Sequence, residues 1–155
     1  MRIITNTVLN WFWNEIYAEI SFAKVILMNT HDHHNPEEFE KQLVELDEKL
    51  NHNPNDTKLL LEKSSCLRHL ERVDEALEIH EKLISLDSEN IDFIFMKGLL
   101  LVEFERNEEA IPYFDQVLAI KPDHRDATFN KGLALRRIGK TIEAKDLMKK
   151  AFNMK

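Results

Sequence analysis

The sequence predicts an all-α fold, a solenoid built from antiparallel helix pairs, on three observations. Residues of the same kind recur every 34 positions with no insertion between them, which is the period of a stacked helix–turn–helix unit. Only 3 Gly and 4 Pro are present among 155 residues, which is little punctuation for the many tight turns of a β-sandwich or barrel. Hydrophobic residues make up 43% and charged residues 32%, so the chain can bury a core and stay soluble.

Six columns of residues carry the 34-residue period. They are Pro54, Ser88 and Pro122; Lys63, Lys97 and Lys131; Ser64, Gly98 and Gly132; Leu67, Leu101 and Leu135; Leu70, Phe104 and Ile138; and Ala76, Ala110 and Ala144. The glycine and alanine columns suit two helices that cross closely, where a bulky side chain would overpack at a cost of about 1–3 kcal/mol. A proline ends a second helix, because it pushes the preceding residue out of the helical region.

These columns have a family resemblance. The segments that carry it are Met96-Lys97-Gly98-Leu99-Leu100-Leu101, Glu108-Glu109-Ala110, Ala119-Ile120-Lys121-Pro122-Asp123, Asn130-Lys131-Gly132-Leu133-Ala134-Leu135 and Glu143-Ala144, which resemble the tetratricopeptide repeat. The resemblance covers residues 54–152 and implies a right-handed α-solenoid of about three full repeats plus an atypical N-terminal helix pair. The implied units are 57–90, 91–124 and 125–155. In the first unit, Ser64 and Ser88 stand where the family usually has glycine and proline.

Residues 1–56 precede the repeats and are predicted to form two helices. Residues 7–29 read as one long helix whose apolar residues surround much of the cylinder, so it should be buried on more than one side. Residues 37–51 have Phe39, Leu43, Leu46 and Leu50 on one face, as the second helix of a degenerate unit would. Three roles remain open for the long helix: capping the array, filling its groove as an autoinhibitory ligand, or docking elsewhere.

Within the repeats, apolar spacing agrees with paired helices. Pairs such as Leu101 and Phe104 lie i,i+3 on first helices, and the second helices have an apolar stripe that includes His80 in a core position. Residues 91–95 alternate like a strand, but the repeat register predicts a helix there, because local propensity is a weak prior. Gly139 suits the left-handed turn between two helices, and Pro112 is expected to bend the helix in which it lies.

The resemblance also implies a binding surface. In this family the first helices line a concave groove that takes peptides or helices. From the matching columns, the partner-binding groove residues are Leu61, Ser65, Arg68, Phe95, Leu99, Val102, Phe129, Leu133, Arg136 and Arg137. They include two largely apolar rows bordered by arginines, so we expect an amphipathic or apolar protein segment as partner. The alternative is that these rows only pack against neighbouring first helices.

Charge and composition exclude several classes of function. The net charge of −7 argues against a nucleic-acid binder, which needs clustered cations. Cys66 is the only cysteine, and no secretory pattern or membrane span is visible, so we expect a cytoplasmic protein. No catalytic motif is visible, and we expect no enzyme activity and no cofactor. The loop His31-Asp32-His33-His34 has metal-ligand chemistry, but its crowded ligands make metal binding a remote alternative.

The sequence therefore favours a non-catalytic protein–protein interaction module that binds a partner segment in its groove. The alternative is a structural subunit of a homo- or hetero-oligomeric assembly, joined through the N-terminal helix or through the last helix. Self-association is expected in that second case, because Leu147, Met148, Ala151 and Phe152 follow no further repeat in this sequence.

Overall fold

The computed structural model describes residues 35–153, which fold entirely into helices and contain no strand. The helices are α2 (Pro36–His52), α3 (Thr57–His69), α4 (Val73–Leu86), α5 (Ile91–Glu103), α6 (Asn107–Ile120), α7 (Arg125–Arg137) and α8 (Thr141–Asn153). The all-α prediction is confirmed, including a helix over the strand-like residues 91–95. The predicted helix at 7–29 and the histidine loop lie outside the described residues.

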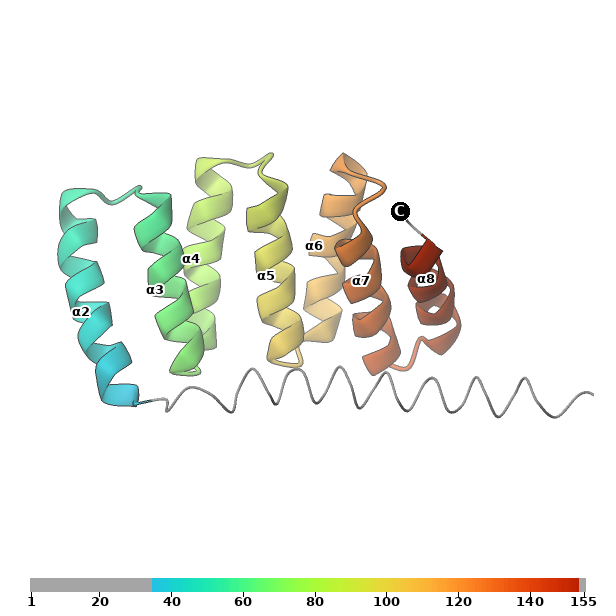
Figure 1. The fold of residues 1–155 in the computed structure, drawn as a ribbon, viewed down its shortest axis with the longest axis horizontal. Helices are drawn as coiled ribbons and strands as arrows, with labels where there is room; N and C mark the ends of the chain where they lie inside the picture. The colour runs from blue at the N-terminus through green and yellow to red at the C-terminus, as the bar shows by residue number, and fades with distance from the viewer. Residues whose placement is uncertain (1–34, 154–155) are drawn as a thin grey trace, which may run out of the picture. The chain divides into compact units, whose positions relative to one another are not determined.

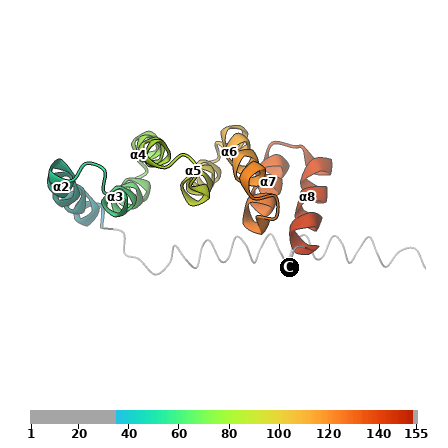
Figure 2. The same ribbon diagram turned by 90° about the horizontal axis from the view of Figure 1, so that it is seen from above.

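Each helix of residues 36–153 packs against the next one in the chain, as in stacked helix–turn–helix units (Figure 1). Seen from above, the first helices α3, α5 and α7 lie along one side of the array, and α4 and α6 lie along the other (Figure 2). Helices α5 and α7 also contact each other directly, so neighbouring first helices are adjacent. The helix-pair solenoid predicted from the 34-residue period is confirmed.

The three first helices begin at equivalent positions because equivalent residues cap them. Asp56 accepts hydrogen bonds from the backbone N–H groups of Lys58 at 3.0 Å and Leu59 at 3.1 Å. Asn90 accepts one from Asp92 N–H at 3.1 Å, and His124 Nδ1 accepts one from Ala127 N–H at 3.2 Å. A side-chain acceptor at this position satisfies N–H groups that have no partner inside the helix. These caps lie 34 residues apart and therefore keep the repeat in register.

The turns within the helix pairs also share one geometry. Glu71, Glu105 and Gly139 have positive φ angles of 57°, 60° and 84°. After α3, Arg72 N–H bonds to Leu67 O at 2.9 Å and Glu71 N–H bonds to Arg68 O at 3.1 Å. This pattern closes a helix through a left-handed residue, which glycine adopts without strain. The left-handed turn predicted at Gly139 is confirmed, whereas two glutamates adopt the same conformation in the other units.

The close crossing of the two helices in a unit explains the small-residue columns. A Cβ added at Gly98 would lie 2.8 Å from Phe114 Cε1, and one added at Gly132 would lie 2.9 Å from Met148 Cγ. The equivalent position in the first unit is Ser64, whose Oγ lies 3.0 Å from His80 Nε2 in a buried hydrogen bond. Both departures in the first unit therefore form one contact. His80 lies in the core, as the apolar stripe predicted.

Candidate interaction surface

The sequence-predicted groove residues lie on helices α3, α5 and α7, in two rows that we call the first-helix face. One row is Leu61, Phe95 and Phe129, and the other is Ser65, Leu99 and Leu133. Ser65 is exposed, and the other five side chains are half-buried. Phe95, Leu99 and Leu133 pack against the core with one side. The face is thus partly apolar and partly accessible along three neighbouring helices.

The two aromatic rings of this face are held by neighbours. The ring of Phe95 lies 5.9 Å from that of Phe114 and 5.0 Å from that of His124, tilted in both cases. The ring of Phe129 meets that of Phe152 edge-on at 6.0 Å. Such offset and edge-on arrangements are the favourable ones for aromatic pairs. These contacts fix the two rings in place and leave part of each ring accessible.

The predicted row of Arg68, Val102 and Arg136 is not uniform. Val102 is only 5% exposed, so its side chain is part of the core and does not offer the contact surface expected from the sequence. The middle unit has neighbours on both sides, which explains the difference. Arg68 reaches Glu103 Oε1 at 2.9 Å, and Arg137 donates to Val102 O at 2.6 Å. Both arginines therefore tie adjacent first helices together, while Arg136 is exposed.

The lysine column forms a series of ion pairs that we call the lysine ladder. Lys63 pairs with Asp47 at 2.5 Å, Lys97 with Glu81 at 2.9 Å and Lys131 with Asp115 at 2.5 Å. In each pair a first helix contacts the second helix that precedes it. From the sequence, these lysines were expected to be a solvated ridge. Lys97 departs furthest from this expectation, because it is only 5% exposed and lies 4.6 Å from the Tyr113 ring centroid.

A second set of ion pairs links the turns. Arg72 bonds to both carboxylate oxygens of Glu75 at 2.6 Å and reaches Glu40 at 3.3 Å. One unit later, Arg106 bonds to both oxygens of Glu109 at 2.7 Å and to Asp74 at 2.7 Å. These hydrogen bonds lower the pKa values of the Glu75 and Glu109 carboxyl groups. Sequence reasoning missed both sets, although the acidic partners also recur every 34 residues.

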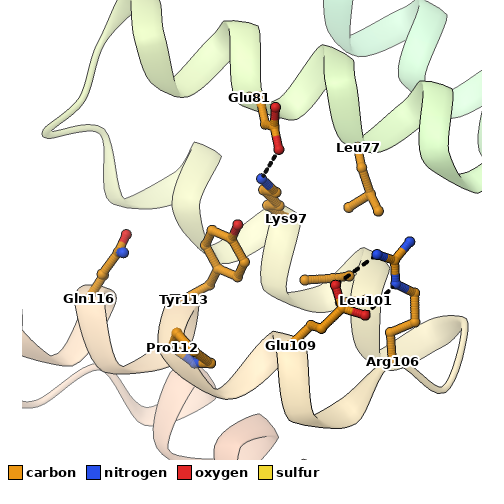
Figure 3. A pocket seen from close by; sticks show the side chains of 9 residues that line it. All are labelled: Leu77, Glu81, Lys97, Leu101, Arg106, Glu109, Pro112, Tyr113 and Gln116. Atoms are coloured by element: carbon orange, nitrogen blue, oxygen red, sulfur yellow. Dashed lines mark hydrogen bonds and ion pairs between the residues drawn. The ribbon is translucent and has the colours of Figure 1, made fainter.

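An open pocket of about 350 Å³ lies between α4, α5 and α6, on the side away from the first-helix face (Figure 3). Its charged groups are already paired: Lys97 points to Glu81 and stands beside Tyr113, and Arg106 is held by Glu109 (Figure 3). The remaining lining residues are Leu77, Leu101, Pro112 and Gln116. A ligand would have to break these pairs to bind a charged group there, so this pocket is a weak candidate site.

Reactive chemistry is scarce in residues 35–153. No group of three or more His, Cys, Asp or Glu within this range has the arrangement of a metal site. Burial raises the pKa of the Cys66 thiol, which disfavours the nucleophilic thiolate. Burial and the charge of Lys97 lower the pKa of His80 to about 4, so it is neutral at physiological pH. None of the seven described helices has the length and apolar content that crossing a bilayer requires.

Residues 95–151 match the family model of the tetratricopeptide repeat. The chain carries tetratricopeptide repeats. The match includes most of α5 and all of α6 and α7, and it ends within α8. Repeats of this family typically serve protein–protein interaction rather than catalysis. A comparison with curated proteins gave no match.

Solved structures of MamA share the helical repeat fold with this chain. MamA 41-end from Desulfovibrio magneticus RS-1 is 24% identical, with a TM-score of 0.66, and the alignment covers 90% of this chain and 74% of that one. A MamA RS-1 ArsTM double mutant is also 24% identical with a TM-score of 0.66, and the alignment covers 75% of this chain and 65% of that one. A crystal structure of MamA is 19% identical with a TM-score of 0.65, at coverages of 80% and 75%.

Proposed function

We propose that this protein is a non-catalytic interaction module whose first-helix face binds a segment of a partner protein. The observation that carries the proposal is the pair of rows on α3, α5 and α7, which repeat every 34 residues and remain partly accessible. Accessible apolar rows of this kind are common in protein interaction sites. The repeat family of the chain supports the same class of function.

The chemistry of the face favours an extended or helical segment with apolar residues and some acidic ones. Leu61, Leu99 and Leu133 offer apolar contacts at regular intervals, which suits a ligand that presents side chains periodically. Arg136 is exposed beside these rows and can pair with a carboxylate of the ligand. Arg68 and Arg137 already bind Glu103 and the backbone, so they contribute mainly to the shape of the face.

A matched pair of substitutions tests the proposal. Ser65 on α3 and Ser85 on α4 are both exposed, but only Ser65 belongs to the first-helix face. Peptides selected from a random library on the full-length protein serve as probes, and their affinity is measured by isothermal calorimetry. Ser65→Arg should weaken binding about tenfold or more, because it places a long charged side chain in the apolar row. Ser85→Arg should leave binding unchanged.

The proposal fails if both arginine variants bind the selected peptides as the unchanged protein does, or if only Ser85→Arg weakens them. Circular dichroism of both variants provides the folding control, since neither serine is buried. The alternative function, a subunit of a larger assembly, is favoured by a different observation. Ile142 and Phe152 on α8 are 82% and 51% exposed, which is unusual for large apolar side chains of a terminal helix.

A further inference from the structure

The outer face of α8 differs from the corresponding face of the other second helices. In α2, α4 and α6, this face carries the acidic member of the lysine ladder, which pairs with a lysine of the next unit. The equivalent position in α8 is Lys149, an exposed cation. A further unit of the same kind would therefore place a lysine against a lysine. The neighbour that fits α8 must instead present an acidic residue at this point.

Three more positions complete this face. Lys145 replaces the apolar column of Leu43, Leu77 and Ile111, and it is exposed. Ile142 is 82% exposed, and Phe152 is 51% exposed while its ring contacts that of Phe129. Positions 142, 145, 149 and 152 are spaced by 3, 4 and 3 residues and so form one stripe along the helix. We call this the α8 stripe: an apolar residue at each end and two lysines between them.

The N-terminal segment of the chain contains the complementary stripe. Trp11, Glu15, Glu19 and Phe22 have spacings of 4, 4 and 3 residues, which place them on one face of the helix predicted at 7–29. This stripe has an aromatic residue at each end and two carboxylates between them. It spans 11 positions, against 10 for the α8 stripe. The two stripes therefore match in length, in apolar ends and in opposite central charge.

We propose that residues 7–29 of a second copy of this chain dock on the α8 stripe as an antiparallel helix, in the place that a further first helix would take. This register pairs Glu15 with Lys149 and Glu19 with Lys145. The aromatic ends then cover the exposed apolar ones, Trp11 over Phe152 and Phe22 over Ile142. The arrangement has the form of the existing contact between α4 and α5, in which Glu81 pairs with Lys97, but with the two charges exchanged.

The occupant belongs to a second copy because the same chain is too short to reach. Only residues 30–35 join the predicted helix to α2, and six residues span at most about 21 Å. Helix α8 lies three units beyond α2, which is roughly 30 Å even at one helix spacing per unit. Docking between copies joins the start of one chain to the end of the next. Such a contact is head-to-tail and extends into a chain or closes into a ring.

Charge reversal in the full-length protein tests the proposal. The acidic-α8 variant is Lys145→Glu with Lys149→Glu, and the basic-segment variant is Glu15→Lys with Glu19→Lys. Each variant alone should associate at least about tenfold more weakly than the unchanged protein, because like charges then face each other. A 1:1 mixture of the two should associate again, since each segment then finds an oppositely charged stripe on the other variant. Sedimentation velocity over a range of concentrations measures both effects against the 18.3 kDa monomer.

The control is Lys41→Glu with Lys121→Glu, which changes the net charge equally at two exposed lysines outside the α8 stripe. It should associate as the unchanged protein does, and circular dichroism should show equal helical content in all variants. The proposal is overturned if the unchanged protein stays monomeric at every concentration, or if the acidic-α8 variant associates normally. It is also overturned if the mixture stays dissociated. Because groove binding uses α3, α5 and α7, its success or failure in the peptide assay is independent of these results.

Discussion

The first and second repeat units form the same helix crossing with different chemistry. In the second unit, Gly98 allows the ring of Phe114 to lie against the backbone of α5, and Phe114 is fully buried. In the first unit, Ser64 and His80 occupy these positions and form a buried hydrogen bond of 3.0 Å. A hydroxyl needs a polar partner when it is buried, and a serine opposite a phenylalanine would have none. The two residues of each crossing therefore depend on each other.

The polar crossing leaves one group unsatisfied. His80 Nδ1 is buried and has no hydrogen-bond partner among the described residues, whereas the crossing in the second unit has no polar atom to satisfy. Burial and Lys97 lower the pKa of His80 to about 4, because an added proton would have no solvent or acceptor to stabilise it. The comparison predicts that the second unit contributes more to stability than the first, and that only the first responds to acid.

The largest effect should come from emptying the apolar crossing. Phe114→Ala removes a fully buried ring and should cost about 3–5 kcal/mol in the free energy of unfolding. His80→Ala should cost less, since it also removes the buried polar atom that has no partner. Urea denaturation followed by circular dichroism measures both losses. Equal losses in the two variants would contradict the comparison.

The next effect is a pH dependence confined to the first unit. In the unfolded chain His80 takes up a proton below about pH 6.5, but in the folded state it does so only near its pKa of about 4. The contribution is therefore complete above pH 6.5 and is lost as the pH falls towards 4, on the order of 3 kcal/mol. The variant His80→Phe with Ser64→Gly copies the second unit and should lose this part of the dependence. Identical pH profiles for both proteins would refute it.

A smaller effect tests whether crowding decides the choice of residue at the crossing. Gly98→Ser should destabilise by about 1–3 kcal/mol, because the new Cβ would lie 2.8 Å from the Phe114 ring. Helix propensity alone predicts the opposite sign, since glycine is the weaker helix former. Adding Phe114→His should recover part of the loss by recreating the pair of the first unit. Thermal denaturation distinguishes these outcomes, and a stabilised Gly98→Ser variant would show that the crossing has room to spare.

The smallest effect should be the same in both units. Glu71 and Glu105 both have left-handed backbone angles, which cost a residue with a Cβ more than they cost glycine. Glu71→Gly and Glu105→Gly should each stabilise by about 0.5–1 kcal/mol, after the greater freedom of glycine in the unfolded chain is counted. The third unit supplies the reverse test, because Gly139→Ala should destabilise. A gain at one glutamate and a loss at the other would mean that the units differ beyond their crossings.

Much of the fold could be predicted from the sequence, because its main determinants are local or periodic. The 34-residue spacing and the Gly98 and Ala110 columns indicate helix pairs that cross closely, whatever the identity of the surface residues. The Ser64–His80 bond was harder to anticipate, since it joins two departures from the pattern that were considered separately. The lysine ladder was missed for a related reason. Its partners lie 16 residues apart on different helices, and only the packing brings them together.

The candidate surface was less predictable than the fold. The column rule assigns Val102 and Arg136 to the same environment, yet Val102 is buried and Arg136 is exposed. The rule treats all units alike, whereas a middle unit has neighbours on both sides and an end unit has one. For the same reason the outer face of α8 could be interpreted only after the contacts of the inner units were known.

Methyl NMR during titration with a selected peptide tests the central claim, binding along the first-helix face, most directly. Leu61, Leu99 and Leu133 report on that face, and Ile79 and Ile120 report on α4 and α6. Binding as proposed shifts the three leucine signals at a common affinity and leaves the two isoleucine signals in place. Shifts confined to Ile79 and Ile120, with the leucine signals unchanged at saturation, would contradict it.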